Sequence, residues 1–467
     1  MPITRQQGTV QPGWRWGPFT ARLPLYHTRI EWPDLLQGLV VTAATAMALV
    51  PLLQSGFGLS FEEAIACSML HFMLIASGPL LFGDPFAPGW TTPALPITVA
   101  FVLGNYDDPS ERFRVMTALS LDFAALMLFF GVTGLGQRFV NWLPKALKGG
   151  IILGASIASF KRVFFDDIET FLRQPVSTTI AIVVCLVFAF SLPFARYTQR
   201  YKWLAALANL GLLPGFVIAA VVGGVVGEIE FNVSWGFLVP PVGDLWAKVS
   251  PWAIGWPTLD MLLASFPVAI ITYTITFGDF ITGREVTDEA AASRPDEQID
   301  INVERAHYAV SIRNGLMAML APFFPTQGVL WTGVHVIIVQ RWRRGRESMD
   351  SLFSGISSFY LFGLPIIFFL LPVITLLQPM MGIALSISLV LTGFACAYVA
   401  MVIPETPEER SVALMTGVSL AMLEPWVGLL VGLVATYLIV GGRGVEQKAQ
   451  SEPSLDTPVS FAPAGEP

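Results

Sequence analysis

One carboxylate lies inside an apolar stretch, where a charge is costly. Asp279 is near the end of the apolar segment 258–282, and the hydroxyls of Thr276 and Thr282 flank it. Carboxylates at membrane depth are usually functional, because they take up a proton or, together with hydroxyl oxygens, coordinate sodium. Asp279 is therefore a candidate site for a coupling proton or sodium ion. The alternative is that it already lies at the cytoplasmic boundary, beside Arg284.

Histidine and glutamate side chains offer weaker candidates. His335 has a ring that can carry a proton near neutral pH, so it is a second candidate for ion coupling. A lone histidine in an apolar helix more often only satisfies its hydrogen bonds in the packed interior, and this alternative stays open. Glu63 follows Ser60 by three residues, which is the spacing of a capping box at the start of a helix.

Two apolar segments are too short and too broken to cross a bilayer, because a spanning helix needs about 20 residues. They are 93–104, which begins in the Pro/Thr/Gly-rich stretch 89–96, and 327–340, which begins in 324–328. Their starts carry hydroxyls, an amide and accessible backbone, which suit a neutral polar or anionic solute, although the threonines could instead cap their own helices. The predicted solute-binding residues are Thr91, Thr92, Ala94, Thr276, Thr326, Gln327, Gly328 and Trp331.

The composition indicates that a membrane surrounds these groups. Of the 467 residues, 54% are hydrophobic and only 13% are charged, whereas a soluble domain is about a quarter charged. A soluble enzyme, a disordered chain and a nucleic-acid-binding protein are therefore excluded. The sequence has no zinc-protease motif, no phosphate-binding glycine-rich loop and no nucleophile elbow, so we expect neither an enzyme nor a cofactor.

Twelve further apolar segments are candidate membrane spans. With the two half-helices they predict an all-α polytopic membrane protein of fourteen transmembrane segments. Seven segments per half is an odd number, so the halves have opposite orientations and form a 7+7 inverted repeat. Interrupted segments at matching places of such halves indicate a transporter's solute site, because irregular backbone at membrane depth must be buried in protein or line a cavity. The twelve are 34–56, 61–82, 113–136, 145–160, 176–194, 203–226, 258–282, 306–322, 352–373, 380–402, 409–423 and 425–441.

Charge placement predicts the side of the membrane that each loop occupies. With the N-terminus in the cytoplasm, the cytoplasmic segments hold 20 of the 27 Lys and Arg residues, as the positive-inside rule requires. We expect a cytoplasmic N-terminal segment 1–33, a transmembrane transporter domain 34–441 and a disordered cytoplasmic tail 442–467. The first 33 residues lack the apolar core of a signal peptide. The expected location is the bacterial inner (plasma) membrane.

Several short motifs are similar to those of a known transporter family. In chain order they are Leu36-Gln37 followed by Val50-Pro51-Leu52-Leu53; Leu143-Pro144-Lys145-Ala146-Leu147 followed by Gly149, Gly150 and Gly154; Phe277-Gly278-Asp279; and Asn314-Gly315-Leu316 leading to Phe324-Pro325-Thr326. Together they resemble the nucleobase–ascorbate transporters, the xanthine/uracil permease family. In layout, the resemblance covers most of residues 34–441.

This resemblance implies a transport mechanism. Segments 1–4 and 8–11 would form a core domain, and segments 5–7 and 12–14 would form a gate domain that often carries a dimer contact. The solute would bind between the third and tenth segments, which carry short antiparallel strands. It would cross the membrane by an elevator-like or rocking motion of the core against the gate, coupled to protons or sodium.

Two acidic side chains that grip a nucleobase in that family are absent here, because their positions correspond to Ile275 and, approximately, Trp331. The main expectation is an ion-coupled symporter of a small polar solute, a nucleobase-like heterocycle first, with Trp331 stacking on the solute or narrowing the pocket. The alternative is a transporter of inorganic or small organic anions of the bicarbonate/sulfate type, which belong to the wider superfamily. A passive channel is a weaker alternative. Expected partners are the solute, membrane lipid and a second copy joined through the gate domain, without nucleic acid.

Overall fold

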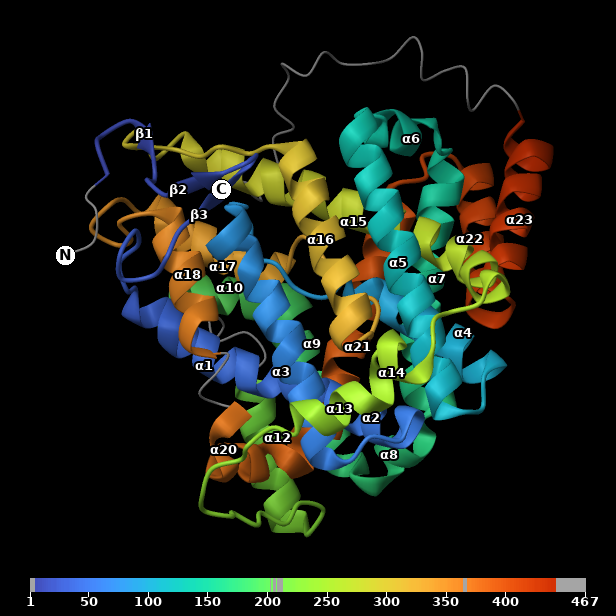
Figure 1. The fold of residues 1–467 in the computed structure, drawn as a ribbon, viewed down its shortest axis with the longest axis horizontal. Coiled ribbons are helices and arrows are strands. Elements are labelled where there is room, and N and C mark those ends of the chain that lie inside the picture. The colour runs from blue at the N-terminus through green and yellow to red at the C-terminus, as the bar shows by residue number, and fades with distance from the viewer. Residues whose placement is uncertain (1–4, 202, 205–206, 208–212, 364–367, 442–467) are drawn as a thin grey trace.

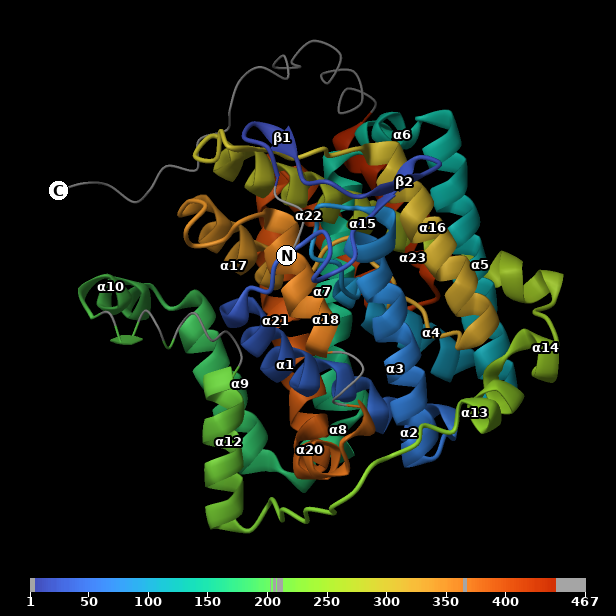
Figure 2. The ribbon, with the colours of Figure 1, turned by 60° about the vertical axis from the view of Figure 1, so that its left-hand side comes forward.

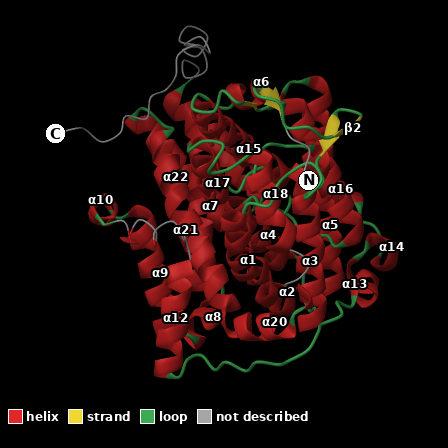
Figure 3. Cartoon of the chain, turned by 90° about the vertical axis from the view of Figure 1, so that its left-hand side faces the viewer, coloured by secondary structure: helices red, strands yellow, loops and turns green. Residues whose placement is uncertain are grey.

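The computed structural model describes residues 5–201, 203–204, 207, 213–363 and 368–441, so the predicted tail lies outside the described residues. Helices dominate the described chain, and short strands occur near its N-terminal part (Figures 1 and 3). The elements of the first half are β1 (Thr9–Val10), β2 (Trp14–Trp16), β3 (Phe19–Ala21), α1 (Trp32–Ala46), η1 (Met47–Leu49), α2 (Val50–Phe57), α3 (Phe61–Ser77), η2 (Gly78–Phe82), η3 (Thr92–Ala94), α4 (Leu95–Asn105), α5 (Pro109–Thr133), α6 (Gly136–Trp142), α7 (Lys145–Lys161), η4 (Arg162–Asp166), α8 (Ile168–Arg173), α9 (Pro175–Phe190), α10 (Leu192–Arg200) and α12 (Leu213–Val226).

The second half continues with a connecting stretch and a further series of helices. Its elements are α13 (Val242–Val249), α14 (Pro251–Ile254), α15 (Leu259–Ala291), β4 (Glu297–Gln298), α16 (Val303–Leu320), α17 (Thr332–Arg343), α18 (Leu352–Gly363), α20 (Leu371–Leu377), η5 (Gln378–Met380), α21 (Met381–Val402), α22 (Pro407–Met422), α23 (Pro425–Ala435) and η6 (Thr436–Val440).

The lengths of the helices support an integral membrane protein but do not confirm fourteen spans. In the described part of the chain, four helices are long and apolar enough to cross a membrane, or five if the bent pair α9–α10 is one span. Several predicted spans are shorter apolar helices instead, because prolines and glycines divide them; residues 34–56, for example, form α1, η1 and α2. The four helices are Phe61–Phe82, Pro109–Thr133, Leu259–Ala291 and Leu371–Val402.

The two half-helices of the prediction have different outcomes. The first, 93–104, agrees with η3 and α4, which together cover Thr92–Asn105. The second was placed too early at 327–340, because α17 begins at Thr332 and ends at Arg343. The Thr-Gln-Gly sequence before it is a non-helical segment rather than the first helical turn.

Helix packing gathers the elements into two sets. α7 packs against α21 and α22, and α9 packs against α12. Separately, α5 packs against α15 and α16, and α1 packs against α18. We name the first set the gate set and the second the core set, after the domains that the resemblance implies, and this division of the chain remains a prediction. That the two sets move as separate bodies remains a prediction.

The predicted capping box at the start of α3 is confirmed. The Ser60 side chain accepts a hydrogen bond from the Glu63 backbone, and the Glu63 side chain accepts one from the Ser60 backbone. Glu63 also forms an ion pair of 2.7 Å with Lys248. These contacts give Glu63 a structural role at the N-terminus of α3, because the capping box satisfies backbone N–H groups that the first helical turn leaves unpaired.

The N-terminal segment is fastened to two loops of the core set. β1 pairs in parallel with β4, which lies in the connection between α15 and α16. Arg294 in that connection is buried and donates from Nε to Asp296 at 2.7 Å and from Nη1 to the Trp342 carbonyl at 2.6 Å. Arg5 also binds Asp296 through an ion pair of 2.9 Å. Residues 283–305 are therefore the helical end of α15, a tightly held connection and the start of α16.

These arginines also affect the pKa of Asp296 in the connection between α15 and α16. Hydrogen bonding from Arg294, followed by that from Arg5, holds the pKa of Asp296 well below its usual range, although partial burial opposes this. A depressed folded-state pKa means that the contribution to stability is complete above the ordinary pKa of about 4 and is lost as the pH falls below it.

We predict that Arg294→Ala lowers the free energy of unfolding by about 3–5 kcal/mol, because it leaves buried carboxylate and carbonyl groups without their donor. The control is Arg284→Ala, since Arg284 pairs with Asp288 on an exposed surface at the end of α15 and such pairs contribute about 0.5 kcal/mol or less. Denaturant unfolding in detergent at pH 7 compares the two variants. Equal losses would show that the Arg294 network does not fasten the N-terminal segment.

Candidate functional site

Two extended segments cross directly before the half-helices α4 and α17. The Trp331 N–H donates to the Ala87 carbonyl at 2.7 Å, and the Gly328 N–H donates to the Gly89 carbonyl at 2.8 Å. The Thr91 N–H donates to the Pro325 carbonyl at 3.0 Å. The partner numbers fall along one segment as they rise along the other, so the pairing is antiparallel. These bonds satisfy backbone groups that would be costly to leave unpaired among apolar helices.

The crossing is close enough to require glycine at two positions. A Cβ atom on Gly328 would lie 2.7 Å from the Thr91 Oγ1 and 2.8 Å from the Gly89 carbonyl oxygen. A Cβ atom on Gly89 would lie 2.7 Å from the Trp331 Cβ. A side chain at Gly328 would therefore collide with the facing segment of the protein itself, in addition to any effect on a solute.

Thr91 and Thr276 are brought together by the structure. Thr91 is the N-cap residue of η3 but makes no side-chain cap. Its Oγ1 lies 3.4 Å from the Thr276 Oγ1 of α15, so the hydroxyl points across to another helix. Thr92 is half-buried beside it, whereas Ala94 is buried in an apolar cluster with residues of α7 and α22, including Leu147 and Leu420.

The remaining predicted solute-binding residues point in other directions. Thr326 donates from Oγ1 to the Phe323 carbonyl at 2.8 Å. Gln327 donates from Nε2 to the His71 carbonyl of α3 at 3.1 Å. Both side chains lie in the packed interior and precede the start of α17. Trp331 is the N-cap residue of α17, is half-buried, and packs edge-on against Phe359 with ring centroids 6.1 Å apart.

His335 has partners for both ring nitrogens. The Thr287 hydroxyl donates to the Gly283 carbonyl at 2.8 Å, so its oxygen accepts from the His335 Nε2 at 3.0 Å. Nδ1 is then the acceptor for the Ala87 N–H at 3.4 Å. This tautomer follows from the single hydroxyl proton of threonine. The arrangement favours the structural alternative, in which the ring connects α17 to α15 and to the crossing.

Asp279 lies one helical turn after Thr276 on α15 and is half-buried. Within the described residues it has neither a hydrogen bond nor an ion pair. Ile275, one turn before it on α15, packs with Leu147 of α7 and Leu420 of α22, so this part of α15 lies where the two helix sets meet. Residues three positions apart share one side of a helix. The carboxylate oxygens of Asp279 therefore have no protein donor among the described residues, and its role as a coupling site remains a prediction.

Arg313 is a residue of the site that sequence reasoning missed. It is buried in α16 with 1% exposure, and its Nη2 donates to the Gly328 carbonyl at 3.0 Å. Its Nε and Nη1 have no hydrogen-bond partner among the described residues. Among the carboxylates, Asp84 exerts the strongest electrostatic attraction on the Arg313 guanidinium. Asp84 is shared between two arginines, however, because its Oδ1 lies 3.7 Å from the Arg305 Nε. An arginine inside the predicted span 306–322 was the signal available from sequence.

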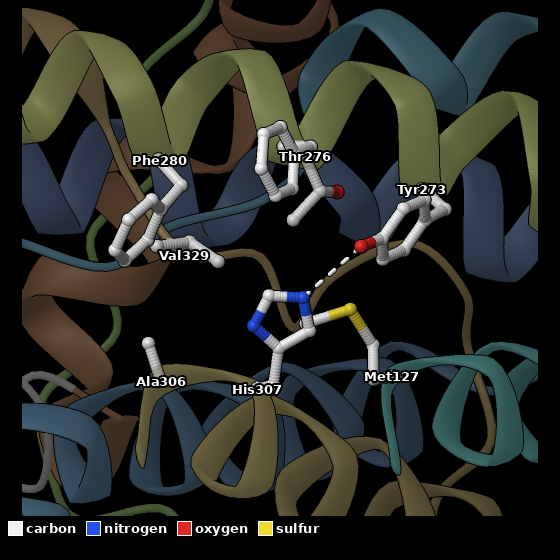
Figure 4. A pocket seen from close by; sticks show the side chains of 8 residues that line it. Met127, Tyr273, Thr276, Phe280, Ala306, His307 and Val329 are labelled. Atoms are coloured by element: carbon white, nitrogen blue, oxygen red, sulfur yellow. Dashed lines mark hydrogen bonds between the residues drawn. The ribbon is translucent and has the colours of Figure 1, made fainter. Parts of the chain in front are cut away.

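A small cavity adjoins the other side of Thr276 (Figure 4). The space open to the centre of a water molecule is about 10 Å³. The cavity therefore has room for about one water molecule. Tyr273 and His307 meet at its wall, with 3.1 Å between the Tyr273 hydroxyl and the His307 Nε2. Sequence reasoning did not single out His307, whose partner on α15 is distant along the chain. The lining residues are Met127, Tyr273, Thr276, Phe277, Phe280, Ala306, His307 and Val329.

No protein-family model matches the chain, and no curated protein matches it. Solved structures do match. The murine solute carrier 26 family member A9 anion transporter, in its inward-facing state, is 14% identical with a TM-score of 0.51, over 88% of this chain and 68% of that chain. The transmembrane domain of the cyanobacterial bicarbonate transporter BicA is 14% identical with a TM-score of 0.50, over 86% of this chain and 97% of that chain. At this identity, the likeness shows a shared fold. Neither of these two structures is named as a nucleobase–ascorbate transporter.

We predict that Gly328→Ala separates the crossing segments and destabilises the protein by about 1–3 kcal/mol, as overpacking in a tight interior does. The control is Gly315→Ala in α16, where an added Cβ meets nothing within 4 Å and the better helix former should be neutral or stabilising by up to about 1 kcal/mol. Thermal unfolding in one detergent compares both variants. Equal stability of the two would mean that the crossing is looser than described.

Proposed function

We propose that this protein transports a small inorganic or organic anion of the bicarbonate or sulfate type, in place of the nucleobase-like heterocycle that was the main sequence expectation. The observation that carries the proposal is the start of α4 and α17 at one crossing, with neither start capped by a side chain. Both starts carry a partial positive charge, which favours anions. The first turn of α17 adds unpaired N–H groups, whereas Pro93 and Pro96 have no N–H to offer at the start of α4. The fold shared with two anion transporters supports the same conclusion.

Arg313 adds a full positive charge behind this crossing. Its guanidinium donates a hydrogen bond to the Gly328 carbonyl. The N–H groups of its Nε and Nη1 have no hydrogen-bond partner among the described residues. A buried cation that is only partly neutralised raises the local potential and favours an anion nearby. We propose that Arg313 acts through this potential and through the position of Gly328, without touching the anion.

The positions where a nucleobase transporter carries acids support the proposal. Ile275 is buried in the apolar cluster against α7 and α22, and Trp331 packs on Phe359. Neither position supplies the carboxylate acceptors that the N–H groups of a heterocycle require. Thr91, Thr92 and Thr276 supply hydroxyls, which can donate to an anion.

Ion coupling would then fall to Asp279. A proton or sodium ion on this carboxylate would offset the charge of an anion bound one turn away, near Thr276, and would make the two bind together. Because Asp279 lies where the two helix sets meet, loading it would also reduce the cost of moving a charged site past the gate. We propose an elevator-like or rocking motion of the core against the gate on this basis.

Ligand stabilisation tests the class of solute. The purified protein should be stabilised by bicarbonate, sulfate or a small carboxylate, and not by uracil or xanthine. An anion at about 100 times its dissociation constant stabilises by about 2.7 kcal/mol, which a thermal-shift assay resolves. Ionic strength is held constant with a large organic buffer ion. Stabilisation by uracil or xanthine alone would contradict the proposal and restore the nucleobase expectation.

Asp279→Asn tests the coupling site. The amide keeps the size of the side chain but loses the charge, so accumulation against a gradient should fall to background. Counterflow exchange should persist, because it needs no ion gradient. Uptake into proteoliposomes with and without an imposed proton or sodium gradient distinguishes the two activities. Full concentrative uptake by the variant would assign Asp279 a structural role.

A further inference from the structure

The chain turns sharply where α9 meets α10. The two helices are bent by 65° at Ser191. Ser191 caps α10 by accepting from the Phe194 N–H at 3.3 Å, and Pro193 lies within the first two helical residues. Phe194 stacks on Phe188 of α9, with ring centroids 4.4 Å apart and planes 10° apart. Serine caps and early prolines both start a new helix, so the turn is built by local sequence and held by the stacked rings.

After the turn, α10 projects from the edge of the helical body (Figures 2 and 3). Its direction differs from that of the apolar helices α9 and α12, which run alongside each other. Where α9 crosses a bilayer, a bend of this size would place α10 close to the plane of the bilayer surface. Nothing in the described part of the chain covers its outer side, as the exposed fractions of 73% for Leu192 and 55% for Tyr197 show.

The charge of this region has one sign. The stretch 174–227 contains no Asp or Glu, and all of its Lys and Arg residues lie within 196–202. Arg196 and Arg200 are exposed, and neither forms an ion pair within the described residues. Nine of the other 18 arginines in the described residues form ion pairs with carboxylates; Arg341, for example, binds Glu31 at 3.1 Å. The charges of α10 are therefore available to an outside partner.

Aromatic side chains accompany these arginines. Trp203 is 66% exposed and Tyr201 is 41% exposed directly after the helix, and the Arg200 guanidinium lies 5.6 Å from the centroid of the Tyr201 ring. Amphipathic rings beside arginines are typical of helices that lie at the boundary between headgroups and acyl chains. A soluble acidic protein would match the charge but would leave these rings in water.

We propose that α10 is a binding site for anionic phospholipid headgroups in the leaflet that it faces, and that it anchors α9 and α12 there. Arg196 and Arg200 bind the phosphate groups, while Tyr197 and Trp203 insert at the headgroup boundary. The proposal is independent of the transported solute. It would fix the gate set of helices to the bilayer surface while the core set moves.

The test compares lipid binding by the full chain and by Arg196→Gln/Arg200→Gln. Phosphatidylglycerol added to detergent-purified protein should raise the Tm of the wild type, and phosphatidylcholine should not. In the double variant, at least half of this rise should be lost. Native mass spectrometry should show at least threefold fewer bound phosphatidylglycerol molecules.

The matched control is Arg284→Gln/Arg343→Gln, which also removes two exposed arginines but takes them from exposed ion pairs. The control should keep the full wild-type response to phosphatidylglycerol. An equal response in the α10 variant would overturn the proposal, as would a rise in Tm with inorganic phosphate as large as that with the lipid. An unchanged Tm of the α10 variant in phosphatidylcholine shows that it is folded.

Discussion

The structure depends on one constraint, which is that backbone polar groups placed among apolar helices must find hydrogen bonds. The segments before α4 and α17 are extended, so they lack the internal bonds of a helix. They satisfy one another at the crossing, where Gly328 donates to Gly89 and Trp331 donates to Ala87. The surrounding side chains complete the pairing, since Arg313 donates to the Gly328 carbonyl. Glycine is needed at the crossing because any side chain would separate the two segments.

The chemistry of the site follows from the same constraint. Two helices that begin at one crossing direct their N-terminal dipoles to a common region. The Thr91 hydroxyl turns toward Thr276 of α15 instead of capping η3. The site thus has donors, a buried cation and few acceptors, which is the complement of an anion. Asp279 supplies the opposite charge one turn away, so a coupling cation and an anion would neutralise each other during movement. The fastened N-terminal segment keeps the α15–α16 connection fixed to the end of α17.

Local signals in the sequence were sufficient where neighbouring residues decide the structure. The break before 93–104 could be predicted from Pro93 and Pro96. The capping box could be predicted from the spacing of Ser60 and Glu63. The start of α17 could not be predicted from sequence, because Thr326 looks like a helix cap but bonds to the Phe323 carbonyl three residues earlier. Gln327 bonds to the His71 carbonyl, which is distant along the chain. Arg313 and the His307–Tyr273 pair depend on contacts between helices far apart in the chain. The solute class that we propose rests on the crossing as a whole, which short motifs similar to one family do not determine.

The most direct test of the account is to locate a bound anion. Crystals of the full chain grown with bromide or iodide should show an anomalous peak at the crossing, within hydrogen-bond distance of the first-turn N–H groups of α4 or α17 and of the Thr91 or Thr276 hydroxyl. The peak should weaken when the transported anion is added as a competitor. Strong anomalous peaks elsewhere, with none at the crossing, would contradict the assignment of this site to an anion.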